Sequence, residues 1–169
     1  ARMQCLPTLL SQATTKTYQN MIEFSFETLR PLGMTSVLAQ TLATADAPID
    51  TDPKASPPQW MRTAAVHRET VEVHDGMQQS PARCAARLTR SLLEEGMALA
   101  VGDWVLCQRD EHQQLWVILR AKPVSQIGRR DADGSRHTVV SNVDTALLVM
   151  GLDLDFNLQR LERYLALVG

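Results

Sequence analysis

One apolar stretch near the C-terminal end constrains the fold of this 169-residue chain more than any other feature. Residues 143–150, VDTALLVM, are apolar apart from Asp144 and Thr145 and do not alternate with polar residues. That pattern is typical of a strand covered on both faces, as in a parallel sheet. Gly151 ends the run, and turn-forming residues follow up to Asn157. The stretch therefore predicts a buried strand and a tight connection.

An amphipathic helix is predicted directly after this connection, in which Asp153, Asp155 and Asn157 supply turn and N-cap chemistry. Its apolar positions recur at helical spacing, at Leu158, Leu161, Leu165 and Val168. A strand followed by a helix is half of a βαβ crossover, whose second strand would come next. Because the sequence stops at Gly169, we expect a chain truncated inside an α/β domain. The strand over 145–150 would then lack parallel neighbours, which favours aggregation or a dimer through that edge.

Short strands dominate the middle of the chain. Residues 63–75 alternate apolar and polar positions up to the turn at Asp75-Gly76, and residues 101–110 and 114–123 each indicate a strand. Residues 82–93 are ambiguous between strand and helix. Four short strands within about 60 residues, joined by turns, favour a small closed barrel. The five-stranded OB-fold is the usual barrel of that size, and it commonly binds RNA or single strands.

The flanks of the predicted barrel are less regular. Residues 1–20 show no period and are consistent with a leader before a start at Met21, and residues 22–42 predict a short helix broken at Pro31–Gly33. Residues 126–137 are polar and rich in turn residues. The predicted plan is a leader and linker over 1–59, an OB-fold RNA-binding domain over 60–125, a connector over 126–138 and the start of an α/β domain over 139–169.

Composition excludes several classes of protein. Apolar residues make up 44% and charged residues 21%, which indicates a globular chain. The three cysteines, including Cys107, have no metal-ligand spacing, which predicts reduced thiols in a cytoplasmic protein with neither a zinc site nor a cysteine nucleophile. No apolar run approaches the roughly 18–20 residues of a membrane span. We therefore expect no membrane association.

Four motifs follow one another in an order that resembles a known family. They are VGDWV (101–105), the Arg-Arg of IGRRDADG (127–134), NVDTALLV (142–149) and DFNLQRLERYL (155–165). The chain resembles the ribosome small-subunit-dependent GTPases of the RsgA family, also called YjeQ or EngC. The resemblance is strong from about Val101 to Val168, and weaker but continuous from Arg62.

The resemblance implies a fold class and a function. Members have an N-terminal OB-fold, then a circularly permuted P-loop GTPase domain, then a zinc-binding domain. We therefore expect a mainly β chain: a five-stranded barrel followed by the first strand and helix of that GTPase domain. The family hydrolyses GTP during late maturation of the small ribosomal subunit, so the implied partners are that subunit and its rRNA, with no DNA partner.

The chemistry of the GTPase lies outside this sequence. The N-K-x-D motif and the G-x-x-x-x-G-K-[ST] phosphate loop are absent from it. We therefore expect no catalytic, cofactor-binding or metal-binding residues in this chain, and no hydrolysis by it alone. GTP, Mg²⁺ and Zn²⁺ are expected for a complete family member. Residues 131–134, DADG, match a GTPase switch pattern, but their place before the predicted strand indicates an ordinary turn.

Arginines are the candidates for contact with rRNA, because the planar guanidinium binds phosphate bidentately and stays charged. Residues 61–130 carry 10 basic and 8 acidic side chains, a net charge of +2. The alternative is a solvated surface with ordinary ion pairs to nearby glutamates. The adjacent Arg129 and Arg130 are the strongest individual candidates. The full set is Arg83, Arg87, Arg90, Arg109, Arg120, Lys122, Arg129 and Arg130.

Other residues admit both a structural and a functional interpretation. Trp104 and Trp116 are able to stack on bases, but their apolar strands favour the barrel core. Asn142 and Asp144 stand at the amino end of the predicted strand, which favours turn chemistry or a contact to the barrel. Two alternatives to a GTPase fragment remain: a standalone OB-fold module with the last helix buried on the barrel, and an inactive truncated product.

Overall fold

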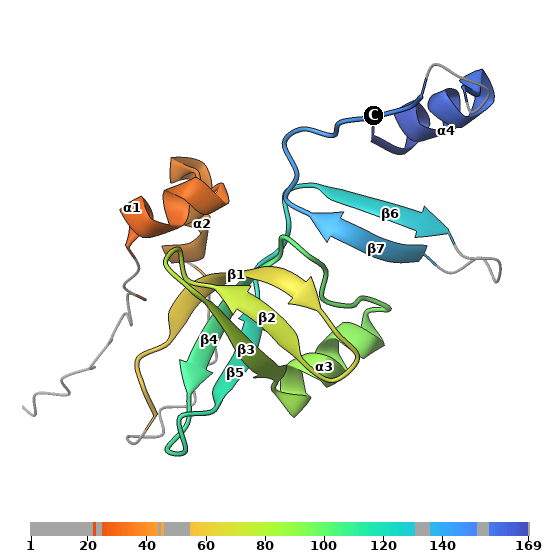
Figure 1. Cartoon of the computed structure of the whole chain (residues 1–169). Coiled ribbons are helices and arrows are strands. Elements are labelled where there is room, and N and C mark those ends of the chain that lie inside the picture. Colours follow the sequence, from red (N-terminus) through yellow and green to blue (C-terminus); the bar gives the residue numbers. More distant parts are fainter. Residues whose placement is uncertain are drawn as a thin grey trace, which may run out of the picture.

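Five strands close into a barrel in the order β1-β2-β3-β5-β4, with β1 paired to β4 (Figure 1). The computed structural model describes residues 22, 25–43, 45, 55–130, 136–151 and 156–168. Only β3 and β5 are parallel neighbours in the barrel, and α3 (Ala86–Glu94) connects β3 to β4. This architecture confirms the predicted OB-fold. The strands are β1 (Gln59–Val66), β2 (Val71–His74), β3 (Gln79–Cys84), β4 (Trp104–Arg109) and β5 (Leu115–Arg120).

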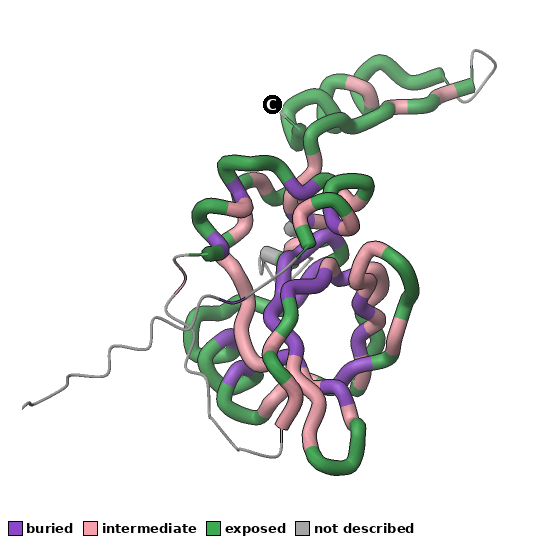
Figure 2. Tube along the Cα trace, turned by 90° about the vertical axis from the view of Figure 1, so that its left-hand side faces the viewer, coloured by how far each residue is buried: buried purple, intermediate pink, exposed green. Residues whose placement is uncertain are grey.

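Alternation along the strands fills the barrel interior. Val71 and Val73 of β2, Val105 of β4 and Val117 of β5 are buried in one apolar cluster. In Figure 2 the buried residues, drawn in purple, concentrate along the barrel. Leu88 and Leu92 of α3 join the same cluster. The helix therefore closes one end of the barrel with its apolar side and leaves its other side in solvent.

Two segments differ from the sequence prediction in detail. Residues 63–75 form two strands, because the chain turns after Val66 and the N–H of His67 bonds the carbonyl of Thr70 at 2.9 Å. The ambiguous stretch 82–93 contains both a strand end and a helix. Ala85 is extended, with φ −62° and ψ 138°, and the helix begins at the next residue. The two-residue period of a strand and the 3.6-residue period of a helix therefore both occur within 82–93, and this explains the ambiguous pattern.

The N-terminal helices cover the outside of the barrel. They are α1 (Phe26–Leu29), η1 (Arg30–Leu32) and α2 (Ser36–Ala43). Leu29 and Leu42 from these helices share a second apolar cluster with Trp60 and Trp104 from β1 and β4. The predicted break at Pro31–Gly33 is confirmed, because Pro31 lies in η1 and Gly33 adopts φ +90°. Residues 1–21 and most of the predicted linker lie outside the described residues.

Residues 126–130 and 136–141 pair as two antiparallel strands, within the stretch where the sequence predicted a polar connector over 126–138. β6 (Gln126–Arg130) pairs antiparallel with β7 (Arg136–Ser141). Backbone pairing does not depend on apolar side chains, so this polar hairpin carries little hydrophobic pattern. A parallel bridge between Val101 and Val140 joins it to the turn before β4. The DADG sequence over 131–134 lies outside the described residues.

The predicted strand over 143–150 is wrong: this segment forms no strand. Leu147 and Val149 are 86% and 88% exposed, and no described strand pairs with the segment. A strand of a parallel sheet needs neighbours to satisfy its backbone groups, and none lies beside it in the described parts of the chain. The helix that follows is confirmed as α4 (Leu158–Val168), which lies beside β6 (Figure 1). Its N-cap is Asn157, whose Oδ1 accepts the N–H of Arg160 at 3.0 Å.

Candidate nucleic-acid interface

Three of the eight predicted RNA-contact residues lie on β3 and on the helix that follows it. Arg83 is near the end of β3, and Arg87 and Arg90 are three residues apart on α3. Because Leu88 and Leu92 turn inward, the two helical arginines project outward, and all three arginines are exposed. None of the three forms an ion pair or hydrogen bond within the described part of the chain. Their guanidinium groups are therefore available to an anionic partner.

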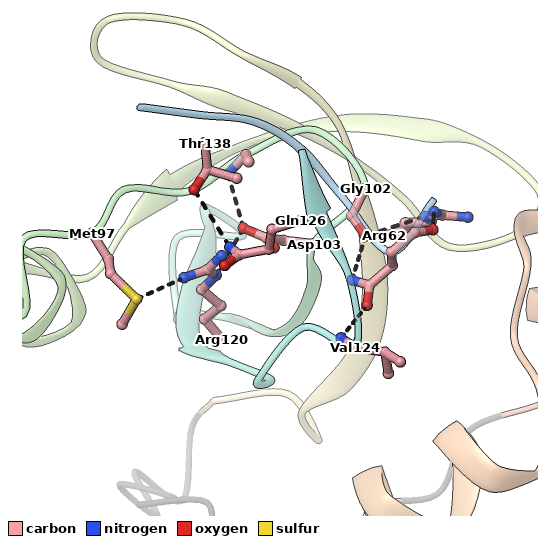
Figure 3. A network of polar contacts seen from close by, with 10 residues as sticks. Arg62, Met97, Gly102, Asp103, Arg120, Val124, Gln126 and Thr138 are labelled. Carbon is pink, nitrogen blue, oxygen red and sulfur yellow. Dashed lines mark hydrogen bonds and ion pairs between the residues drawn. The ribbon is translucent and has the colours of Figure 1, made fainter. Parts of the chain in front are cut away.

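Arg120 does not belong to this surface. Its guanidinium donates to both carboxylate oxygens of Asp103, at 2.8 Å and 3.0 Å, and its side chain is only 4% exposed (Figure 3). Oδ2 of Asp103 also accepts the N–H of Ala100 at 2.8 Å. Asp103 is fully buried and needs a countercharge, so Arg120 stabilises the turn of the VGDWV motif. Because its guanidinium is buried and paired, we do not propose Arg120 as an RNA contact.

The other predicted contacts are dispersed. Nη1 of Arg109 donates to the carbonyl of Gln113 in the β4–β5 turn, at 3.0 Å. Lys122 is exposed after β5, and Arg129 is exposed on β6. The side chain of Arg130 lies outside the described residues, so the structure describes the side chain of only one member of the predicted pair, Arg129. These residues do not share the strand and helix that carry Arg83, Arg87 and Arg90.

A groove lies between the β1–β2 turn and the C-terminal end of α3. It has a volume of about 760 Å³, and its walls include Arg83 of β3, Leu93 of α3 and Trp116 of β5. Trp116 is half-buried on the outside of the barrel, which corrects the expectation that it lies in the core. The pattern of β5 held the signal: Leu115 and Val117 point inward, so Trp116 between them points outward. Trp104 is buried as expected, beneath the N-terminal helices.

Arg62 joins three segments that are far apart in sequence, and sequence reasoning missed it. Its guanidinium donates to the carbonyls of Leu32, of Gly102 at 3.3 Å and of Asn142 at 2.8 Å. It also lies over the ring of Trp104, 5.6 Å from the centroid. Burial lowers the pKa of Arg62, and the charge of Asp144 opposes this shift. We call Arg62, Gly102 and Asn142 the Arg62 junction.

Asn142 contacts the barrel, as the sequence predicted. Its Nδ2 donates to the carbonyl of Gly102 at 2.9 Å, and its Oδ1 accepts the N–H of Val124 at 2.9 Å (Figure 3). The backbone of Asn142 has φ +54°, a conformation that asparagine tolerates better than most residues. Gly102 has φ +88°, and a Cβ there would collide with the carbonyl of Ser141. The VGDWV and NVD motifs therefore meet through these two residues.

The thiols of Cys84 and Cys107 are poorly suited to nucleophilic chemistry. Burial raises the pKa of the Cys84 and Cys107 thiols, which disfavours the thiolate of a nucleophile. No cluster of three His, Cys, Asp or Glu side chains suited to a metal ion is found in the described ranges. Within the same ranges, no helix is long and apolar enough to cross a bilayer.

Comparisons with known proteins find curated relatives for part of the chain. RsgA, the small ribosomal subunit biogenesis GTPase of Leptospira interrogans, is 36% identical over 80 residues, which cover 46% of this chain and 22% of that protein. RsgA of Xanthomonas oryzae pv. oryzae is 41% identical over 70 residues, which cover 41% of this chain and 18% of that protein. The matched stretch is similar to the RsgA family. That finding agrees with the resemblance carried by the sequence motifs.

The two other comparisons add less. The crystal structure of YloQ, a circularly permuted GTPase, aligns with 64% of this chain and 36% of its own, at 19% identity and a TM-score of 0.43. No protein-family model matches the chain. The chain spans about a fifth of the length of the curated RsgA relatives that it matches.

Proposed function

We propose that the barrel of this chain binds rRNA of the small ribosomal subunit, as the N-terminal part of a cytoplasmic RsgA-type ribosome-biogenesis GTPase. The observation that carries the proposal is the set of three exposed arginines on β3 and α3, Arg83, Arg87 and Arg90, none of which has an ion-pair partner in the described ranges. Similarity to curated RsgA proteins supports the ribosomal partner. A complete protein of this type would also bind GTP with Mg²⁺, and a zinc-binding domain would hold Zn²⁺.

The arginines act locally, because the chain as a whole carries a net charge of −2. Each arginine that neutralises a phosphate releases a counterion, so affinity falls as salt rises. Contacts of this kind position the barrel on the RNA without reading its sequence. Glu94 and Glu95 at the end of α3 limit the extent of the positive surface. The proposed interface is therefore narrow and is expected to be strongly salt-dependent.

Charge reversal tests the proposal. The variant Arg83→Glu/Arg87→Glu/Arg90→Glu is expected to bind purified small ribosomal subunits at least about tenfold more weakly in sedimentation assays, with a shallower dependence on salt. The matched control is Arg160→Glu/Arg163→Glu, because both residues are exposed on α4. Equal losses in the two variants would show a general charge effect and contradict the assigned surface. Absence of binding by the wild-type chain would contradict the proposed function.

Hydrolysis is assigned to the complete protein and not to this chain. A phosphate loop works because backbone N–H groups and a lysine surround the phosphates, and the sequence contains no such motif. GTP turnover by the purified 169-residue chain would refute this part of the proposal.

The rival function, a standalone OB-fold module, requires that α4 bury its apolar side on the barrel. No residue of α4 is fully buried, and Leu158 and Leu165 are 58% and 53% exposed. Figure 2 shows this segment almost wholly exposed. Exposure of that apolar side argues for the GTPase interpretation, in which the helix covers a sheet.

A further inference from the structure

A row of polar and aromatic side chains crosses three strands on the outside of the barrel. Arg83 of β3 stands opposite Trp116 of β5, and Gln108 of β4 stands opposite the same Trp116 from the other side. Their chain neighbours Cys84, Val117 and Cys107 form the adjacent row inside the barrel core. Because successive side chains of a strand point to opposite faces, Arg83, Trp116 and Gln108 share the outer face.

The indole of Trp116 is held in place by the β4–β5 turn. Its Nε1 donates to Oδ2 of Asp110 at 2.9 Å. The other carboxylate oxygen of Asp110 accepts the backbone N–H groups of His112 and Gln114, each at 2.9 Å. The carboxylate is fixed by the backbone, so the ring that bonds to it has a restricted orientation. A half-exposed aromatic ring held this way is a preorganised stacking surface.

The groove beside this ring combines apolar walls with two arginines and one acidic side chain, Glu69. Leu93, which is 78% exposed, and Met97 line it from α3 and the residues after it. Arg68 of the β1–β2 turn and Arg83 of β3 are cations on the same groove, and both are exposed. Apolar surface suits the face of a base, and guanidinium groups suit the phosphate attached to it. The volume of about 760 Å³ lies within the range of small-ligand sites.

We infer that this groove is a subsite for one unpaired nucleotide of the RNA, whose base stacks on Trp116 and whose phosphate binds Arg83. The inference rests on the proposed function and deepens it, because the outer arginines alone bind duplex and single strands alike. A base inside a helix is stacked on its neighbours and does not reach Trp116. The groove therefore selects single-stranded RNA, in which bases are free.

Tryptophan fluorescence tests the subsite directly. The chain has three tryptophans, and Trp60 and Trp104 are buried at 0% and 1% exposure, so a change on RNA binding reports Trp116. Titrating the full chain with a single-stranded oligoribonucleotide is expected to quench the emission, and an RNA duplex of equal length is not. The quenching disappears in Trp116→Phe, because the indole that reports binding is gone. Phenylalanine keeps an aromatic ring but loses the bond to Asp110, so the affinity of this variant is expected to lie between that of the wild type and that of Trp116→Leu. Trp116→Leu is expected to bind the single strand about 5- to 100-fold more weakly.

The outcomes separate this inference from the proposed function. Binding of small ribosomal subunits with no quenching by single strands, and with no loss in Trp116→Leu, overturns the subsite and leaves the proposed function standing. Equal quenching by duplex and single strand overturns the selection for unpaired nucleotides. Arg83 is exposed, so Arg83→Gln does not disturb the core and provides a second variant if Trp116→Leu fails to fold. An unchanged affinity in Arg83→Gln overturns the assigned phosphate contact.

Discussion

Asp110 shows how one side chain sets the geometry of a whole turn. Its hydrogen bond from Trp116 is the main reason that its pKa lies below the ordinary value of 3.8, and the N–H groups of Gln114 and His112 add to the shift. A carboxyl whose folded-state pKa is lowered stabilises the fold above its unfolded pKa and loses that contribution as pH falls through the folded value. We expect the free energy of unfolding of the wild type to fall more steeply with acidification below about pH 4 than that of Asp110→Asn. Urea titrations followed by circular dichroism measure both curves, and parallel curves would contradict the assigned role.

The same residues show what sequence reasoning reaches and what it misses. Strand β5 was predicted, and its alternation implied that Trp116 faces outward, but the apolar neighbours suggested a core position. Arg120 appeared as one more surface cation because nothing in the sequence reveals that Asp103 is buried opposite it. The contacts of Arg62 could not be predicted from the sequence for a related reason. Its three carbonyl partners come from separate segments. Every residue has a main-chain carbonyl, so the sequence does not indicate which carbonyls accept a hydrogen bond from Arg62.

At the scale of elements, the Arg62 junction connects η1, the turn before β4 and the exit of β7. Arg62→Ala removes three hydrogen bonds from a charged donor, and the carbonyls of Leu32 and Asn142 lose that donor, whereas the carbonyl of Gly102 keeps its bond from Nδ2 of Asn142. We expect a loss of about 2–4 kcal/mol in the free energy of unfolding, measured by urea denaturation. Arg62→Lys should recover only part of it, since one ammonium group does not reproduce the fork of a guanidinium.

A control and a local readout make this test specific. Arg68→Ala alters an exposed arginine in the β1–β2 turn, and it should change stability by less than about 0.5 kcal/mol. Hydrogen exchange at Val124 is the local readout, because its N–H bonds Asn142. Faster exchange at Val124 in Arg62→Ala is expected. Unchanged exchange there would show that Asn142 keeps its position without Arg62.

Elements that are defined by a local sequence pattern are the most predictable. Strands β4 and β5 and helix α4 follow from alternation, turn residues and helical spacing, and each is present. The predicted strand over 143–150 fails because a strand of a parallel sheet is defined by its neighbours, and apolar composition alone does not provide them. The β6–β7 pair is the opposite case, because the sequence predicted only a connector there and no strand. Its backbone pairs are satisfied in a segment whose side chains carry no strand pattern.

At the scale of the whole molecule, the barrel buries its apolar residues and the C-terminal segment does not. Leu147 and Val149 are almost fully exposed, and Leu158 and Leu165 of α4 are more than half exposed. Apolar surface gathered in this way favours association, because burying it against another copy removes it from water. We expect the chain to self-associate with rising concentration in sedimentation velocity. Leu158→Glu/Leu165→Glu should shift it toward the monomer, whereas Met77→Glu, at an 82% exposed position of the β2–β3 turn, should not. A wild-type chain that stays monomeric throughout would show that this segment is covered within one molecule.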